Sequence, residues 1–382
     1  MCTLFKFLPM YKLFLCIFIQ LLCFSCNKKN EIAFFVNSSY EDCGTFMDKD
    51  TKSEFVFFAK RNFNPHLKIF DSQANFKDSI SLKKAEEIVG KITKVWMTEE
   101  DSIFVFSSNT QKYVVVDNRG DPIHTKEFGK SISDKNNNFY DFYPPFMQSM
   151  DMRYNSEVIY TTFWVGNTKY SPDENNKTLS LVMNHIRDGY LMYREQNYSS
   201  KSLPPTFGIR ISDFVELRDL QESVFLPYYK TLILNDRYFL LTYYSRYIYE
   251  LDANLDITDR FKVVPDELSV VQPMPDVEDD TSLEKLDVQI ENQSYVSNLL
   301  YVKDKNRFVV ILKTGKSTKE DIFSYPFKVL IYNSSLDKLL KSYEFNSTAF
   351  IPGSSFVLLN KLYVEKKNES HNKRVYESIE VY

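Results

Sequence analysis

The chain has 382 residues, and its 47 basic and 51 acidic side chains give a formal net charge of −4. No basic stripe occurs, which argues against nucleic acid as a partner. The 26 tyrosines and 32 phenylalanines, against only 9 glycines, favour β-strands whose turns are made by asparagine, aspartate and serine. The length is enough for one large β domain or for two ordinary domains.

The N-terminal segment has the layout of an export signal. An apolar run at 13–24 follows two lysines, and no acidic residue occurs before Glu31. The run is too short to span a bilayer, for which a helix needs roughly twenty apolar residues. It ends at Ser25-Cys26, which resembles the lipobox of bacterial lipoproteins. We therefore predict that residues 1–25 are a lipoprotein signal peptide and that Cys26 is the lipid-attachment residue. The alternative is an ordinary cleaved signal that leaves a free cysteine.

The cysteines are consistent with cleavage of the signal and lipidation of Cys26. Three of the five lie within the signal and Cys26 would carry lipid, so Cys43 remains as the one thiol of the mature chain. A disulfide framework is therefore excluded despite export. We expect Cys43 to be a small buried or half-buried residue, because catalysis would need a nearby base.

Four stretches of the mature chain share one pattern. In each, a strand-like run ends in Asp or Asn, two free positions follow, and then come Ala, Gly or Leu and a second apolar-alternating run. The four anchors are Asp71, Asp117, Asp252 and Asn333. Because such side chains bond their own backbone two residues on, the pattern predicts a hairpin turn. A further alternating run precedes each anchor, so the unit is a meander of about four strands, as in propeller blades.

The spacing of the units predicts the number of blades. The stretches near 130–155, 197–224 and 263–294 contain no repeat and are interpreted as insertions, the last one as an insertion or a short helix. One further hairpin is predicted to turn at 187–189, which gives five blades. The tail supplies three strands of a sixth blade, and the run at 31–37 provides the missing strand. Residues 26–382 are thus predicted to be a single all-β propeller of six four-stranded blades, with seven as the alternative.

The lipobox-like start, the stretch DRYFLLTYYSRYIYELDANLD and the spacing of the units resemble those of Bacteroidetes lipoproteins with a DUF4221-type domain. That group is related to six-bladed propellers of the NHL and TolB kinds. The resemblance covers most of the mature chain and implies its fold and its compartment. It transfers no catalytic residue.

The sequence carries no compact catalytic or metal-binding motif. There is no zinc-site spacing, no nucleophile elbow and no phosphate-binding loop. We therefore expect no catalytic residue, no metal site and no cofactor. The four histidines stand alone in the sequence at His66, His124, His185 and His371.

Two aromatic stretches are candidates for ligand binding. The segment 136–154 contains closely spaced aromatic residues with acidic and basic neighbours, which could hold a sugar or a peptide at the mouth of the propeller. The stretch TYYSRY is the second candidate. The alternative is that these aromatics cover blade edges or belong to the core. The candidate ligand-binding residues are Tyr140, Asp141, Tyr143, Arg153, Tyr243, Tyr244 and Arg246.

These observations favour a lipid-anchored binding or interaction module over an enzyme. We predict an outer-membrane lipoprotein. It is expected to face the periplasm, because the residues after Cys26 lack the acidic cluster associated with surface export. Surface exposure is the alternative. The expected partners are the membrane, through the lipid, and a glycan, a peptide or an envelope protein. One alternative is a glycan hydrolase or lyase with carboxylates from separate blades. Another is a structural subunit of an envelope complex, which would expose a broad apolar patch.

Overall fold

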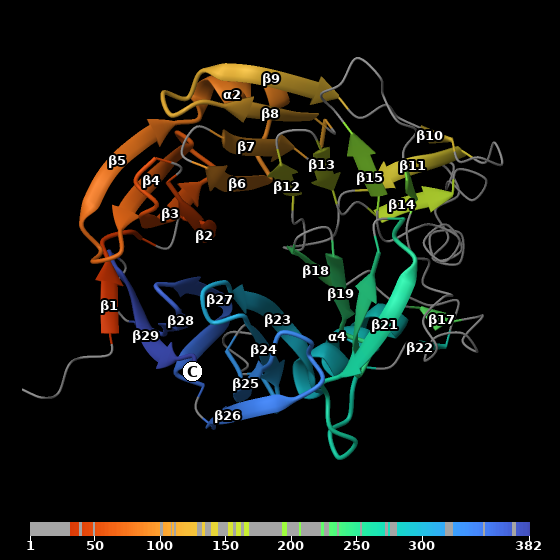
Figure 1. Cartoon of the computed structure of the whole chain (residues 1–382). Coiled ribbons are helices and arrows are strands. Elements are labelled where there is room, and N and C mark those ends of the chain that lie inside the picture. Colours follow the sequence, from red (N-terminus) through yellow and green to blue (C-terminus); the bar gives the residue numbers. More distant parts are fainter. Residues whose placement is uncertain are drawn as a thin grey trace, which may run out of the picture.

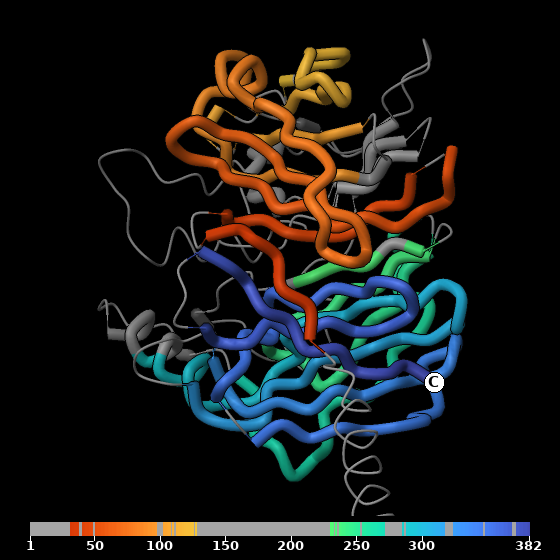
Figure 2. The backbone as a smooth tube through the Cα atoms, turned by 90° about the vertical axis from the view of Figure 1, so that its left-hand side faces the viewer, coloured from red at the N-terminus to blue at the C-terminus, as the bar shows by residue number. Residues whose placement is uncertain are grey.

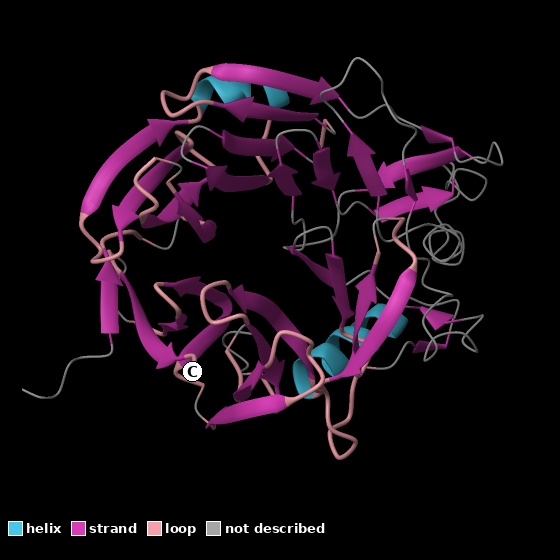
Figure 3. Ribbon diagram, in the orientation of Figure 1, coloured by secondary structure: helices cyan, strands magenta, loops and turns pink. Residues whose placement is uncertain are grey.

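The computed structural model describes residues 31–382 with interruptions, the longest at 168–192, 197–205 and 208–222. Side chains are described mainly within 31–127 and 230–382. The described chain is almost entirely β-structure, and its antiparallel sheets are arranged around a central axis (Figures 1 and 3). The protein is thus an all-β propeller with four-stranded antiparallel blades, as predicted.

Two successive sheets form the N-terminal part. The first contains β2 (Asp42–Met47), β3 (Glu54–Lys60), β4 (His66–Asp71) and β5 (Phe76–Ser81) in chain order. The second contains β6 (Lys94–Glu99), β7 (Ser102–Ser107), β8 (Lys112–Val116) and β9 (Pro122–Glu127). Helix α2 (Lys83–Val89) connects them and packs its buried Ala85 and Val89 into the core between the two sheets.

Two further four-stranded sheets lie in the C-terminal half. One contains β18 (Tyr229–Leu234), β19 (Arg237–Thr242), β20 (Tyr247–Leu251) and β21 (Ile257–Lys262). The next contains β23 (Tyr295–Val302), β24 (Arg307–Lys313), β25 (Phe327–Tyr332) and β26 (Leu339–Phe345). Helix α4 (Thr281–Asn292) precedes β23, as expected for a short helix within 263–294.

The closing sheet joins the first described strand of the chain to the last three. It contains β27 (Phe350–Leu358), β28 (Lys361–Lys366) and β29 (Arg374–Glu380), with β1 (Glu31–Phe34) as its fourth strand. The pairing of β1 with β29 is antiparallel and sets Glu31 opposite Glu377 and Phe34 opposite Arg374. The prediction that the N-terminal run completes the last sheet is confirmed.

The region between β9 and β18 holds shorter strands. β12 (Met152–Asn155), β13 (Val158–Thr161), β15 (Tyr193–Gln196) and β16 (Thr206–Phe207) form another four-stranded sheet. β10 (Ile132–Ser133), β11 (Phe139–Tyr143) and β14 (Trp164–Asn167) form a three-stranded sheet, and β17 (Ser223–Val224) pairs with β22 (Met274–Pro275).

The sequence interpretation placed an insertion near 130–155. Within it, the aromatic run Phe139–Tyr143 is the strand β11, which pairs with β14 from Tyr140 to Tyr143 and with β10 at Phe139 and Tyr140. Further along, β13 and β14 follow each other closely in the chain but belong to different sheets. The hairpin predicted at 187–189 lies outside the described residues.

Three of the four predicted anchors make the same turn, and the turn at Asn333 is one residue longer. The Oδ1 of Asp71 accepts hydrogen bonds from the backbone N–H groups of Gln73 and Asn75, both at 2.9 Å. Asp117 and Asp252 accept the equivalent pairs, and Asn333 accepts one from Lys338. The third residue after each anchor has a positive φ, and each turn is flanked by a β-bulge. Those positive-φ residues are Ala74, Gly120, Leu255 and Leu336.

Replacing Gly120 with alanine should therefore destabilise the fold. At its φ of +79° an added Cβ would lie 2.2 Å from the Ser81 carbonyl oxygen, so the backbone must shift. We expect the free energy of unfolding to fall by at least about 1–2 kcal/mol, the usual left-handed cost for a non-glycine residue. The matched control is Ala74→Gly, for which we expect a change below about 1 kcal/mol. Urea denaturation of both variants provides the measurement, and equal losses would contradict this account.

Position within a sheet determines how apolar each strand is. β7 (SIFVFS) is buried along its whole length, because neighbouring sheets cover both of its faces. β26 (LLKSYEF) is an outer strand and is largely exposed. Separate apolar clusters fill the spaces between adjacent sheets, and the one at the closing sheet is rich in aromatic rings. The core is thus a series of sheet-to-sheet contacts.

The two ends of the sheets differ in their connections. At one end, the turn face, the connections 48–53, 72–75 and 333–338 are tight turns. At the other end, the insertion face, the chain passes from sheet to sheet, through α2 at 82–93 and α4 at 263–294. None of the described helices is long and apolar enough to cross a membrane.

Candidate binding face

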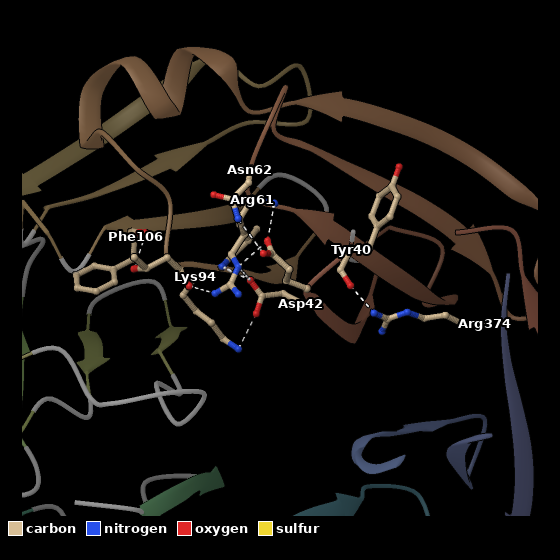
Figure 4. A network of polar contacts seen from close by, with 10 residues as sticks. Tyr40, Asp42, Arg61, Asn62, Lys94, Phe106 and Arg374 are labelled. Atoms are coloured by element: carbon tan, nitrogen blue, oxygen red, sulfur yellow. Dashed lines mark hydrogen bonds and ion pairs between the residues drawn. The ribbon is translucent and has the colours of Figure 1, made fainter. Parts of the chain in front are cut away.

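The first polar cluster on the insertion face surrounds Asp42, at the start of β2. Its carboxylate is 5% exposed and lies 2.8 Å from Lys94 Nζ, at the start of β6. It also accepts a hydrogen bond of 3.0 Å from the Val95 N–H, and Arg61 Nε lies 3.7 Å away (Figure 4). One carboxylate therefore joins the first two sheets where their inner strands begin.

Arg61 extends this network towards solvent. Its backbone N–H and its Nε both donate to Glu41 Oε2, at 3.1 and 3.0 Å, and its Nη1 donates to the Thr93 carbonyl. The Asn62 amide donates to the other oxygen of Glu41 at 2.8 Å. Two acids and two bases thus alternate across the boundary between the sheets, so the described part of this network is neutral.

Substituting Asp42 with asparagine tests the value of the buried carboxylate. We expect a loss of about 1–3 kcal/mol in the free energy of unfolding, because Lys94 loses its charged partner. Glu41→Gln is the matched control, since its pair with Arg61 is partly exposed and such pairs contribute about 0–1 kcal/mol. Chemical denaturation in low and high salt measures both. A loss at Glu41 as large as that at Asp42 would contradict the assignment.

Cys43, the next residue, has a structural environment. Burial raises the pKa of its thiol to about 11, with Arg374 opposing the shift. The thiol donates a weak hydrogen bond to the Ser354 carbonyl at 3.9 Å, which links β2 to the closing sheet. The thiol stays protonated at neutral pH, which is the opposite of what a nucleophile requires.

A tyrosine cluster forms the second group on the insertion face. The half-buried ring of Tyr243 stacks on Tyr295, with ring centroids 3.8 Å apart and planes inclined by 20°. Tyr325 meets Tyr295 edge-on at 6.1 Å. Burial, followed by the influence of Tyr325 and Tyr243, raises the pKa of Tyr295 well above its ordinary value. The Tyr295 phenol therefore remains a neutral hydrogen-bonding group.

Lys313 lies beneath the tyrosines at the end of β24. It is fully buried, and its ammonium donates to the carbonyls of Ile290 and Glu291, the latter at 2.7 Å, in the last turn of α4. The same nitrogen lies over the rings of Tyr295 and Tyr325, 5.1 and 5.4 Å from their centroids. Burial lowers the pKa of Lys313 to about 7, and Glu291 opposes the shift. A cation at a helix C-terminus complements the helix dipole.

The structure places the sequence-predicted site residues in three settings. Tyr243 belongs to the tyrosine cluster, whereas Tyr244 is 3% exposed within the core. Arg246 Nη1 donates to the Pro265 carbonyl, which holds the chain leaving β21. The remaining candidates lie on β11 and β12, whose side chains are outside the described part, and Cys26 precedes it. Those remaining strand residues are Tyr140, Asp141, Tyr143 and Arg153.

Sequence reasoning missed the residues that build both clusters. Asp42 and Lys94 each stand at the start of an inner strand, 52 positions apart (94 minus 42), and neither belongs to a recognisable motif. Lys313 offered a clearer signal, because it ends the apolar run FVVIL in a strand that other sheets cover. A lysine in such a place needs a specific partner.

His66 and His124 lie in the described part of the chain, and their neighbours suit structural roles. His66 Nδ1 lies 2.9 Å from the Asn64 carbonyl, which favours a proton on that nitrogen, and its Nε2 then accepts from the Tyr40 hydroxyl at 2.5 Å. His124 contacts Tyr113. Within the described residues, no three His, Cys, Asp or Glu side chains gather closely enough to hold a metal ion.

Comparison with solved structures places this architecture among known propellers. The crystal structure of a DUF4221 family member from Bacteroides vulgatus matches with a TM-score of 0.65 and 12% identity, over 91% of this chain and 95% of that one. The chain shares the fold of that DUF4221 protein. The expected structural resemblance is thereby confirmed. No family model and no curated protein matches the sequence.

Other solved structures match this chain with lower TM-scores. Hsv2 from Kluyveromyces lactis has a TM-score of 0.40 at 6% identity, over 89% of this chain and 100% of that one. The Dos1 propeller has a TM-score of 0.38 at 10% identity, over 87% of this chain and 69% of that one.

Proposed function

We infer that this protein is a lipid-anchored propeller of six blades that acts as a binding or interaction module in the bacterial cell envelope. Five of the blades are the four-stranded sheets whose side chains are described, and the sheet of β12, β13, β15 and β16 is the sixth. The ligand class that fits is a glycan or a peptide, bound on the insertion face.

The asymmetry between the two faces is the observation that carries this proposal. Described connections on the turn face are short turns, several of them fixed by an Asp or Asn side chain, which leave little room for variation. The insertion face carries α2, α4 and the tyrosine cluster. Binding residues concentrate on variable connections held by a rigid scaffold. The insertion face carries such variable connections, and the turn face lacks them.

The chemistry of the insertion face suits a neutral, hydroxyl-rich or amide-rich ligand. Tyr243 presents a half-buried ring that its neighbour Tyr295 already holds in place, so little side-chain entropy is lost on binding. Tyrosine combines an apolar ring with a hydroxyl, which matches the faces and edges of sugars and peptides. The acids and bases around Asp42 already pair with one another, which gives an anionic or cationic ligand little advantage.

The ligand class is tested by thermal denaturation of the mature protein with panels of glycans and peptides, each mixture being analysed for product. A ligand that binds the native state raises the melting temperature by mass action. We expect an increase without turnover, and a smaller one in Tyr243→Ala. Tyr382→Ala is the matched control, because Tyr382 is 66% exposed at the C-terminus. Turnover would favour the glycan hydrolase or lyase, and a Tyr243 variant with an undiminished shift would contradict the assigned face.

The anchor is tested separately. Cys26→Ala, or treatment with a signal-peptidase II inhibitor, should release the protein from the membrane fraction or prevent its maturation. We propose the periplasmic side of the outer membrane as its location, which protease treatment of intact and permeabilised cells can test. Unchanged membrane retention of the Cys26 variant would contradict lipid anchoring.

A further inference from the structure

Two exposed phenylalanines flank the closing strand β1. Phe35 directly follows the strand and is 72% exposed, and Phe76, the first residue of β5, is 56% exposed. Neither is needed to fill the core, because Phe34 and Phe70 beside them are buried. Exposed aromatic side chains that gather at one place mark an interaction surface.

A continuous set of ring contacts connects Phe34, the neighbour of Phe35, to Phe76 at the edge of the propeller. The ring of Phe34 packs against Phe70 at 5.5 Å, and Phe70 packs against Phe76 at 5.8 Å. Ala74, in the turn between β4 and β5, packs onto the same cluster. Figures 1 and 2 both show the end of β1 beside this turn. Phe35 and Phe76 therefore belong to the rim where the ring closes.

The chain itself brings this rim to the membrane. Cys26 and Glu31 are five residues apart (31 minus 26), so the intervening chain spans at most about 18 Å when fully extended. β1 then adds about 3.3 Å per residue from Glu31 to Phe35. A lipid on Cys26 therefore keeps the rim close to the headgroups. Lys28 and Lys29, the charged residues of the short connection, suit anionic headgroups.

We propose that Phe35 and Phe76 form a membrane-contact surface that holds the propeller edge-on against the lipid bilayer. This surface gives the proposed lipid-anchored module a fixed orientation, and the inference rests on the lipid at Cys26. Phenylalanine side chains at the headgroup boundary contribute apolar burial that a tether alone does not provide. An edge-on propeller leaves the insertion face open to a ligand arriving from the side.

The test uses the mature lipoprotein in vesicles of phosphatidylethanolamine and phosphatidylglycerol, with and without bromine on the acyl chains. Bromine quenches indole fluorescence at short range. The variants are Phe35→Trp, Phe76→Trp and, as the matched control, Phe63→Trp, because Phe63 is 90% exposed on the insertion face. The signal of the two native tryptophans is subtracted using the unsubstituted protein. Flotation with the vesicles is recorded for every sample.

We expect the indoles introduced at positions 35 and 76 to lose most of their emission in brominated vesicles, and the indole at position 63 to keep it. Protein that floats with equal emission at all three positions overturns the membrane-contact surface while leaving the anchor intact. Quenching at position 63 as strong as at 35 and 76 overturns the edge-on orientation. Protein that fails to float overturns both the anchor and this inference.

Discussion

Phe34→Ala is expected to lower the free energy of unfolding by about 3–5 kcal/mol, the usual cost of removing a buried phenylalanine ring. Phe34 is fully buried, and its ring meets Phe58, Phe70, Phe356 and Tyr376 at centroid distances between 5.1 and 6.3 Å. These partners come from the first sheet and from the closing sheet. The cavity would thus open where the two ends of the ring meet.

The matched control is the next residue. Phe35→Ala removes the same ring from a side chain that is 72% exposed, so we expect a change within about 0.5 kcal/mol. Urea denaturation of both variants, followed by far-ultraviolet circular dichroism, gives the comparison. Equal effects at the two positions would show that β1 does not pair with β29 in the register described.

Lys313 is expected to make stability rise with pH between about 7 and 10. Its pKa is about 7 in the folded protein and 10.5 for an unperturbed lysine. Between these values the unfolded chain holds a proton that the folded protein has lost, so the free energy of unfolding increases as pH rises. The limiting slope for one proton is about 1.4 kcal/mol per pH unit. Below pH 7 both states are protonated and the contribution of Lys313 is constant.

The slope is isolated by comparing variants. Lys313→Met keeps a long side chain and removes the titrating group, so the difference in stability between the wild type and this variant should grow in favour of the wild type as pH rises. Lys305→Met, in the exposed turn between β23 and β24, serves as the control and should leave the slope unchanged. Urea denaturation at several pH values from 6 to about 9.5 covers most of the window. A difference that is flat or falls with pH would contradict the buried environment of Lys313.

Local chemistry made much of the fold predictable. Asp71 and its equivalents fix their turns through hydrogen bonds to their own backbone, so the pattern of a few residues is sufficient to identify them. Alternation and apolar runs then identify the strands on either side. The pairing of β1 with β29 followed from a simple count, because a three-stranded tail and an unassigned N-terminal run complement each other.

The candidate site could not be predicted in the same way. Asp42 meets Lys94 because adjacent sheets bring their inner strands together, and nothing near either residue in the sequence records that contact. Lys313 meets α4 through a helix that enters from an insertion. Tyr244, a candidate ligand-binding residue, is 3% exposed, which agrees with the alternative that these aromatics belong to the core. Contacts between sheets depend on packing, whereas turns depend on local backbone chemistry.

The pairing of β1 with β29 also sets an order of events during folding. β1 is synthesised before the other strands, but its partner comes from the last residues of the chain, so this contact spans nearly the whole described sequence. Contacts of such separation form late, because closing the intervening chain costs conformational entropy that only the preformed sheets repay. Each earlier sheet, such as β2 to β5, consists of strands that are neighbours in sequence, so it can form before the C-terminal strands are available. The segment nearest Cys26 therefore stays unpaired until the C-terminal sheet has formed.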